Sequence, residues 1–163
     1  MVNDDIREAL AAAERTFEAS PVTIEAGLDV DDPELIQLRR ACRLLAAGST
    51  LLEGGYYTVV IESSFVAIER TIQFRLIHDG ALEPEEVLSS HRRLYERGAE
   101  TGLYDDQFSD KLADLWTQNR TKTYYRLGIA TAEQAEAMRQ LATDIHQHLV
   151  STSRGKHECL CEG

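Results

Sequence analysis

The chain lacks several features that would assign it to common classes of protein. It has no apolar run of about 18 residues, the length that a membrane-spanning helix needs. Its N-terminus is acidic and amphipathic, unlike a secretory signal with a basic start and an apolar centre. Its three cysteines are too few for a disulfide framework. These absences predict a cytoplasmic protein with no membrane partner.

Lysine and positive charge are also scarce. The 17 basic residues face 28 acidic ones, so the formal net charge is −11 at pH 7, and only Lys111, Lys122 and Lys156 are lysines. A dense acidic surface keeps a protein soluble at high salt, where salt screens its self-repulsion. The composition favours a halophilic protein, and an ordinary acidic cytosolic protein is the alternative. In both cases any RNA contact needs a local basic site or strong screening.

Apolar residues make up 43% of the chain and recur every three or four positions, which is the helix period, with no convincing alternating strand. Long amphipathic segments with short connections are typical of an antiparallel bundle. We therefore predict an all-α protein, an antiparallel (up-down) bundle of four to five helices. It forms a single domain over residues 1–150, followed by a disordered tail over residues 151–163.

Short patterns predict several helix boundaries. Asp32-Pro33 supplies an N-cap and a proline at the first helical position. Thr131-Ala-Glu-Gln134 has the pattern of a capping box. Pro84 is expected to open the fourth helix, and the fifth is expected from about Phe108 to Tyr125.

The third helix is the most apolar, and we expect it to begin between Thr50 and Tyr56 and to run to about Ile77. Its apolar residues lie nearly all round the helix, which predicts a central position in the bundle. The preceding helix is expected to end near Gly48, because glycine weakens helices.

The fifth helix carries the most informative polar residues. Asn119 and Arg120 continue its apolar rows, and Tyr124 and Tyr125 follow. An amide and a guanidinium at a buried edge cost free energy unless both are paired. Arginine can clamp a phosphate, and tyrosine can donate to it or stack on a base. The alternative is an arginine–carboxylate bridge to a neighbouring helix with tyrosine rings in the core.

The sequence positions of the other reactive side chains indicate structural roles. His91 lies on an apolar stripe, which predicts a hydrogen-bonded core histidine. Cys42 also lies on a stripe, as a small core hydrophobe. His157, Cys159 and Cys161 are close in sequence, but a structural zinc site takes four ligands and no fourth is spaced to join them. We therefore expect no metal site.

No glycine-rich phosphate loop, G-x-S-x-G or C-x-x-C motif is present, so no cofactor is expected. The order of features resembles the HEPN superfamily, over about residues 34–150. The resemblance rests on Gly55-Tyr56-Tyr57-Thr58-Val59-Val60-Ile61-Glu62, on His91, and on Leu112, Leu115 and Asn119-Arg120-Thr-Lys-Thr-Tyr124-Tyr125.

The resemblance implies a fold, a partner and an activity. Many HEPN proteins are metal-independent ribonucleases whose site, an arginine and a histidine, is assembled across a homodimer. A subgroup encoded beside minimal nucleotidyltransferases reads arginine, three residues, aspartate, tyrosine; Arg120 and Tyr125 match, and Tyr124 stands in place of the aspartate. The resemblance thus implies catalytic roles for Arg120 and Tyr125, and substrate binding by Asn119 and Tyr124.

The implied protein acts on or binds RNA or a nucleotide across a homodimer cleft, as in a toxin–antitoxin or RNA-processing system. The alternative is a non-catalytic HEPN-like module that binds a nucleotidyltransferase or another protein. Tyr125 stands where many HEPN nucleases have a histidine. This weakens the implied ribonuclease activity, because a tyrosine with a pKa of about 10 is a poorer general base at neutral pH than a histidine.

Overall fold

The computed structural model describes residues 1–120, 128–155 and 159–161. All regular structure in these ranges is helical, which confirms the predicted all-α class. No helix among these residues is long and apolar enough to cross a membrane. The helices are α1 (Asp4–Glu18), α2 (Pro33–Glu53), α3 (Tyr57–His78), α4 (His91–Glu100), α5 (Asp106–Gln118) and α6 (Ala132–Ser151).

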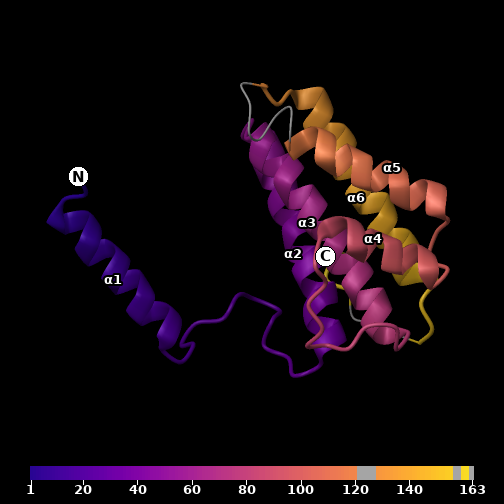
Figure 1. Ribbon diagram of the computed structural model, residues 1–163, viewed down its shortest axis with the longest axis horizontal. Coiled ribbons are helices and arrows are strands. Elements are labelled where there is room, and N and C mark those ends of the chain that lie inside the picture. The colour runs from indigo at the N-terminus through magenta and orange to yellow at the C-terminus, as the bar shows by residue number, and fades with distance from the viewer. Residues whose placement is uncertain (121–127, 156–158, 162–163) are drawn as a thin grey trace.

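Helix α3 is the centre of the bundle, as its all-round apolar pattern predicts. It packs mainly against α2 and α6, with α4 beside it (Figure 1). Val60, Ile68, Ile72 and Leu76 are fully buried. Removing each such side chain from water contributes about 1.5–3 kcal/mol, so this helix supplies much of the stabilisation of the core.

Helices α2 and α3 form a hairpin with a short connection. The predicted end of the second helix near Gly48 is wrong, because α2 continues to Glu53. Gly48 is buried inside the helix, and a Cβ there would stand 3.7 Å from the hydroxyl oxygen of Ser63. The chain turns instead at Gly54 and Gly55, where Gly55 has a φ of +79° that favours glycine.

Helices α4 and α5 form a second pair. The predicted start of α4 at Pro84 is also wrong, since the helix begins at His91, where the side chain of Ser90 accepts a hydrogen bond from the backbone N–H of Arg93. The predicted caps of the other helices are confirmed: Asp32 caps α2, and Thr131 and Gln134 form a capping box on α6.

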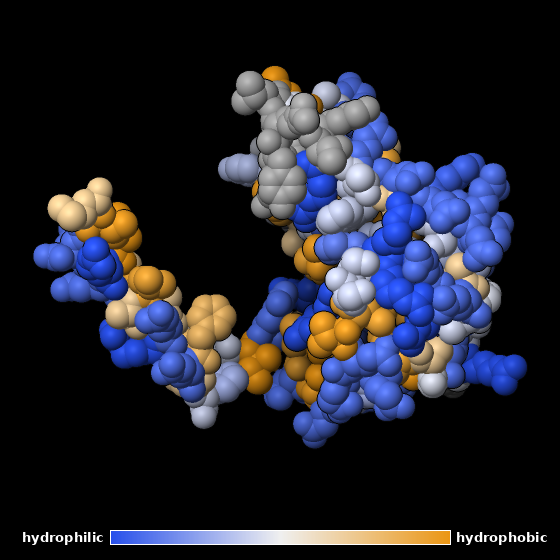
Figure 2. Space-filling view, viewed as in Figure 1, coloured by the Kyte–Doolittle hydropathy of each residue, from blue (hydrophilic) through white to orange (hydrophobic). Residues whose placement is uncertain are grey.

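Helix α1 contributes no buried residue to the bundle. Ile6, Leu10 and Phe17 form an apolar stripe along this helix, but all three are exposed. Figure 1 shows α1 standing away from the other helices, and Figure 2 shows apolar side chains along it. The packed core therefore begins with α2.

Candidate functional site

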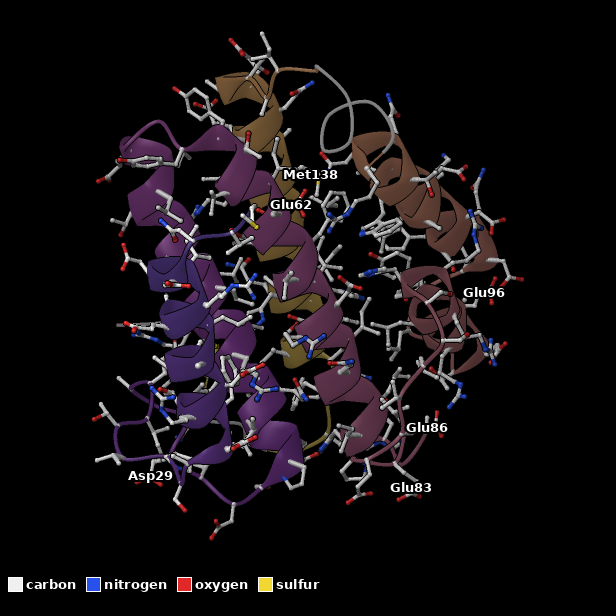
Figure 3. The ribbon with its side chains drawn as sticks, turned by 60° about the vertical axis from the view of Figure 1, so that its left-hand side comes forward. Asp29, Glu62, Glu83, Glu86, Glu96 and Met138 are labelled. Atoms are coloured by element: carbon white, nitrogen blue, oxygen red, sulfur yellow. The ribbon has the colours of Figure 1, made fainter. Side chains whose placement is uncertain are left out.

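The candidate site lies along the side of α3 that faces α4 and α5. Glu62 and Glu69 are seven residues apart on α3, so they lie on the same side of the helix. Figure 3 labels Glu62 on the part of α3 that faces α5. Each carboxylate takes a partner from a different neighbouring helix.

Glu62 binds Asn119 and Arg120, which are the two described residues of the Asn-Arg motif (Asn119, Arg120, Tyr124 and Tyr125). The guanidinium Nη2 of Arg120 lies 2.8 Å from Glu62 Oε2, and the amide of Asn119 donates to Glu62 Oε1 at 2.9 Å. The arginine–carboxylate bridge that the sequence left open is therefore present. Tyr124 and Tyr125, the other two predicted site residues, lie outside the described residues.

Trp116 connects this ion pair to a histidine. The guanidinium carbon of Arg120 lies 5.2 Å from the centre of the indole ring, within cation–π distance. The ring of His91 stacks on the same indole, with centroids 4.2 Å apart and planes 26° apart. One aromatic ring thus contacts a guanidinium from just beyond the end of its own helix and an imidazole from α4.

His91 is bonded to the buried carboxylate of Glu69 through Nδ1. The predicted hydrogen bond is present, but the predicted core position is wrong, because 42% of the His91 side chain is exposed. Burial raises the pKa of the Glu69 carboxyl, while the hydrogen bond and charge of His91 act in the opposite direction. The bond orients the imidazole and leaves Nε2 for proton exchange.

A groove of about 440 Å³ opens beside His91 and Glu69, and Arg70 lines it. Arg70 has no ion pair within the described part of the chain, and its Nε is buried without a hydrogen-bond partner. Burial lowers the pKa of Arg70, and the charge of Glu69 opposes that change. A half-buried guanidinium that makes no direct salt bridge can bind an anionic ligand, although the carboxylates of Glu69 and Glu86 also line this groove.

A smaller cavity of about 150 Å³ lies on the other side of the Asn-Arg motif. Phe65, Leu115 and Met138 supply apolar walls, and Gln118 and Asn119 supply amides. Apolar walls with a few polar groups are typical of small-molecule sites.

A second set of reactive side chains lies away from this groove. Cys42, His146, Cys159 and Cys161 converge although they come from α2, α6 and the tail. Sequence spacing did not reveal the set, because the fourth ligand is not near the tail cysteines in the chain. His157 lies outside the described residues. The sequence signal that could have revealed this cluster is His146, a histidine on the buried stripe of α6.

The fold and the groove together define an all-α protein with a groove along its central helix that is lined by ionisable side chains. The chain belongs to the family described as Domain of unknown function (DUF8154), whose family model matches residues 1–161. No curated protein and no solved structure matches the chain.

Proposed function

We propose that this protein is a HEPN-like up-down bundle that acts on RNA across a homodimer cleft in a toxin–antitoxin or RNA-processing system. The observation that carries the proposal is the groove at His91, where an oriented imidazole lies beside the guanidinium of Arg70, whose buried Nε has no hydrogen-bond partner. Phosphodiester cleavage needs a proton acceptor and a cation for the phosphate, and this groove offers both.

Each residue has a defined part in the proposed reaction. Arg70 binds the phosphate. As negative charge develops on the phosphate, Arg120 leaves Glu62 and binds the phosphate as well. The RNA 2′-oxygen attacks the neighbouring phosphorus while Nε2 of His91 takes the hydroxyl proton. The bond from phosphorus to the 5′-oxygen breaks, and that oxygen takes a proton from the imidazolium. The products are a 2′,3′-cyclic phosphate and a 5′-hydroxyl end.

Glu69 supports this chemistry from inside the core. Its carboxylate holds Nδ1 of His91 and stabilises the positive charge that the ring gains during proton transfer. His91 therefore supplies the histidine that the HEPN resemblance lacks near Arg120. Tyr125 and Tyr124 stay predicted site residues, and Asn119 borders the cavity that would take a base.

The second candidate is a non-catalytic HEPN-like module that binds a nucleotidyltransferase partner. The observation that favours it is the closed arrangement at Glu62, where both carboxylate oxygens are already engaged by Arg120 and Asn119. In that case the Asn-Arg motif ties α5 to α3 and takes no part in a reaction.

The test is cleavage and binding of end-labelled single-stranded RNA in molar KCl with a chelator present, because high salt screens the acidic surface. The wild-type protein should leave cyclic phosphate ends and spare the matching DNA, which lacks the 2′-hydroxyl. His91→Gln should slow cleavage about 10²–10⁴-fold, the usual contribution of a general base. Arg70→Ala should weaken RNA binding about tenfold or more.

Matched controls are Arg92→Ala and His148→Gln, which alter an exposed arginine beside His91 and an exposed histidine on α6. Cleavage that persists unchanged in His91→Gln and Arg120→Ala would contradict the catalytic proposal. Binding of RNA or of a nucleotidyltransferase without cleavage would favour the second candidate. Sedimentation at the same salt should show a dimer, and a monomer would count against both.

A further inference from the structure

The three cysteines and one buried histidine of this chain meet at a single point. Cys42 comes from α2, His146 from α6, and Cys159 and Cys161 from the tail. Their four ligand atoms all lie within 4.8 Å of one another. All three cysteines of the sequence therefore surround one imidazole, and this arrangement points to a function for the cluster.

The separations between the imidazole nitrogen and the sulfurs are close to those in the ligand shell of a tetrahedral ion. His146 Nε2 lies 3.7 Å from Cys42 Sγ, 3.2 Å from Cys159 Sγ and 3.3 Å from Cys161 Sγ. Zinc bonds of about 2.3 Å to sulfur and about 2.0 Å to nitrogen place tetrahedral ligand atoms roughly 3.5–3.8 Å apart. Expansion by a few tenths of an ångström therefore admits the ion.

The imidazole of His146 is held in the form that a metal requires. The hydroxyl of Thr71 donates to the carbonyl oxygen of Ala67 at 2.8 Å, so it accepts at its oxygen from Nδ1–H of His146, 3.0 Å away. With the proton on Nδ1, the lone pair of Nε2 faces the three sulfurs. Ligating histidines characteristically give their other N–H to such a partner.

Backbone donors also face the sulfurs. The N–H of Leu160 donates to Cys42 Sγ at 3.3 Å, and the N–H of Cys161 donates to Cys159 Sγ at 3.4 Å. Hydrogen bonds to sulfur favour the thiolate, which is the metal-binding form. Cys42 and His146 are both 2% exposed, so water is largely excluded from the inner side of the cluster.

A disulfide explains this arrangement less well than a metal ion. Cys42 Sγ and Cys159 Sγ are 3.3 Å apart, but pairing them would leave Cys161 and the oriented lone pair of His146 without a role. Iron–sulfur clusters are held mostly by four thiolates, and hard cations prefer oxygen. Three thiolates and one imidazole are a recognised set for structural zinc.

We propose that Cys42, His146, Cys159 and Cys161 bind one Zn²⁺ ion in a closed, structural site. With all four positions filled by the chain, no coordination site is left for substrate. The ion joins the tail to α2 and α6. Leu160, between the two tail ligands, packs against the linker before α2, where a Cβ on Gly27 would stand 2.5 Å from Leu160 Cδ1.

The test is metal analysis of the full chain purified under reducing conditions, followed by titration of the metal-free protein with Zn²⁺ and Co²⁺. One zinc per chain is expected. The Co²⁺ form should show the intense visible bands of tetrahedral coordination and thiolate-to-cobalt charge transfer in the near ultraviolet. Cys161→Ser, which alters an exposed tail residue, should weaken zinc binding while the helical circular dichroism stays unchanged.

Two matched pairs separate metal binding from folding. His146→Asn should lose the cobalt spectrum, and His148→Asn, two residues further on the exposed side of α6, should keep it. Thr71→Val should weaken zinc binding about 10–100-fold, the usual effect of losing the partner of a ligating histidine. Thr71→Ser keeps the hydroxyl and should bind like the wild type.

Three results would overturn the proposal, the third of which is a disulfide. One is a reduced, folded protein that takes up neither Zn²⁺ nor Co²⁺. Another is a cobalt spectrum that is the same in wild type, Cys161→Ser and His146→Asn, which would place the ion elsewhere. A thiol count showing a Cys42–Cys159 disulfide in freshly isolated protein, with no metal taken up after reduction, would replace the zinc site by a redox pair.

Discussion

His146 and His91 are both oriented by α3, yet their surroundings differ. Thr71 holds Nδ1 of His146, and Glu69, two residues earlier, holds Nδ1 of His91. Two residues along a helix correspond to about 200° of rotation, so α3 orients one imidazole on each side. His146 is buried facing three sulfurs, whereas His91 is partly exposed beside a groove.

The difference lies in the partner at Nδ1. A hydroxyl carries no charge, so it fixes the tautomer of a neutral imidazole and leaves a lone pair for a metal. A carboxylate favours the imidazolium, so it supports a ring that gains and releases a proton. The same residue type is thereby prepared for two kinds of chemistry within one small bundle.

The largest expected effect is removal of the metal from the His146 side. An ion present at about a thousandfold above its dissociation constant stabilises the folded state by about 4 kcal/mol. For a chain of this size, removal by a chelator should lower the melting temperature on the order of 10 °C. Calorimetry of a zinc-loaded sample with and without chelator measures this change in melting temperature. Identical melting curves would contradict a stabilising metal on the His146 side.

The next effect concerns the ion pair on the other side of α3. Arg120→Ala leaves the half-buried Glu62 without its guanidinium partner and should lower the free energy of unfolding by about 1–2 kcal/mol. Urea denaturation measures the change. In the double variant with Glu62→Ala much of the loss should be recovered, and purely additive losses would show that the pair is not coupled.

A smaller effect should appear as a pH dependence. Because burial raises the pKa of Glu69 in the folded state, its contribution to stability is complete below its ordinary pKa and is lost as pH rises through the folded value. Glu69→Gln cannot titrate, so the free energy of unfolding of the wild type should fall relative to this variant over that interval. A tenfold difference in proton affinity between the folded and unfolded chain corresponds to about 1.4 kcal/mol.

Denaturant titrations of the two proteins from acid to neutral pH measure this difference. Curves that run parallel across the range would show that Glu69 titrates alike in the folded and unfolded chain.

The smallest effect is expected for His91→Gln, because the His91 ring is partly exposed and the glutamine amide can still donate a hydrogen bond to Glu69. The free energy of unfolding should change by less than about 1 kcal/mol, and the zinc content should stay that of the wild type. Denaturation and metal analysis check both. A loss of zinc in this variant would mean that the two sides of α3 are not independent.

Local sequence signals account for most of the fold. Asp32-Pro33 and the Thr131–Gln134 box mark helix starts because capping chemistry is local. The predicted end of α2 was wrong because packing overrode the low helix propensity of Gly48. The predicted start of α4 was wrong because Ser90, and not Pro84, marks the first turn of that helix. Helix α1 has a clear apolar stripe, but periodicity alone does not tell which helices share a core.

The two sites were less accessible to sequence reasoning. Asn119 and Arg120 stood out because polar residues on an apolar row need partners, and Glu62 is that partner. The four zinc ligands span residues 42–161 with no common spacing, so only the fold brings them together. The groove at His91 depends equally on where α4 packs against α3.

The stack at Trp116 gives the protein an optical reporter. Trp116 is the only tryptophan in the sequence, so all indole emission comes from the ring that touches both His91 and Arg120. Indole emission depends on the groups that touch the ring. Emission from the unlabelled protein should therefore change when a ligand moves His91 or Arg120 away from Trp116, without a dye or a substitution.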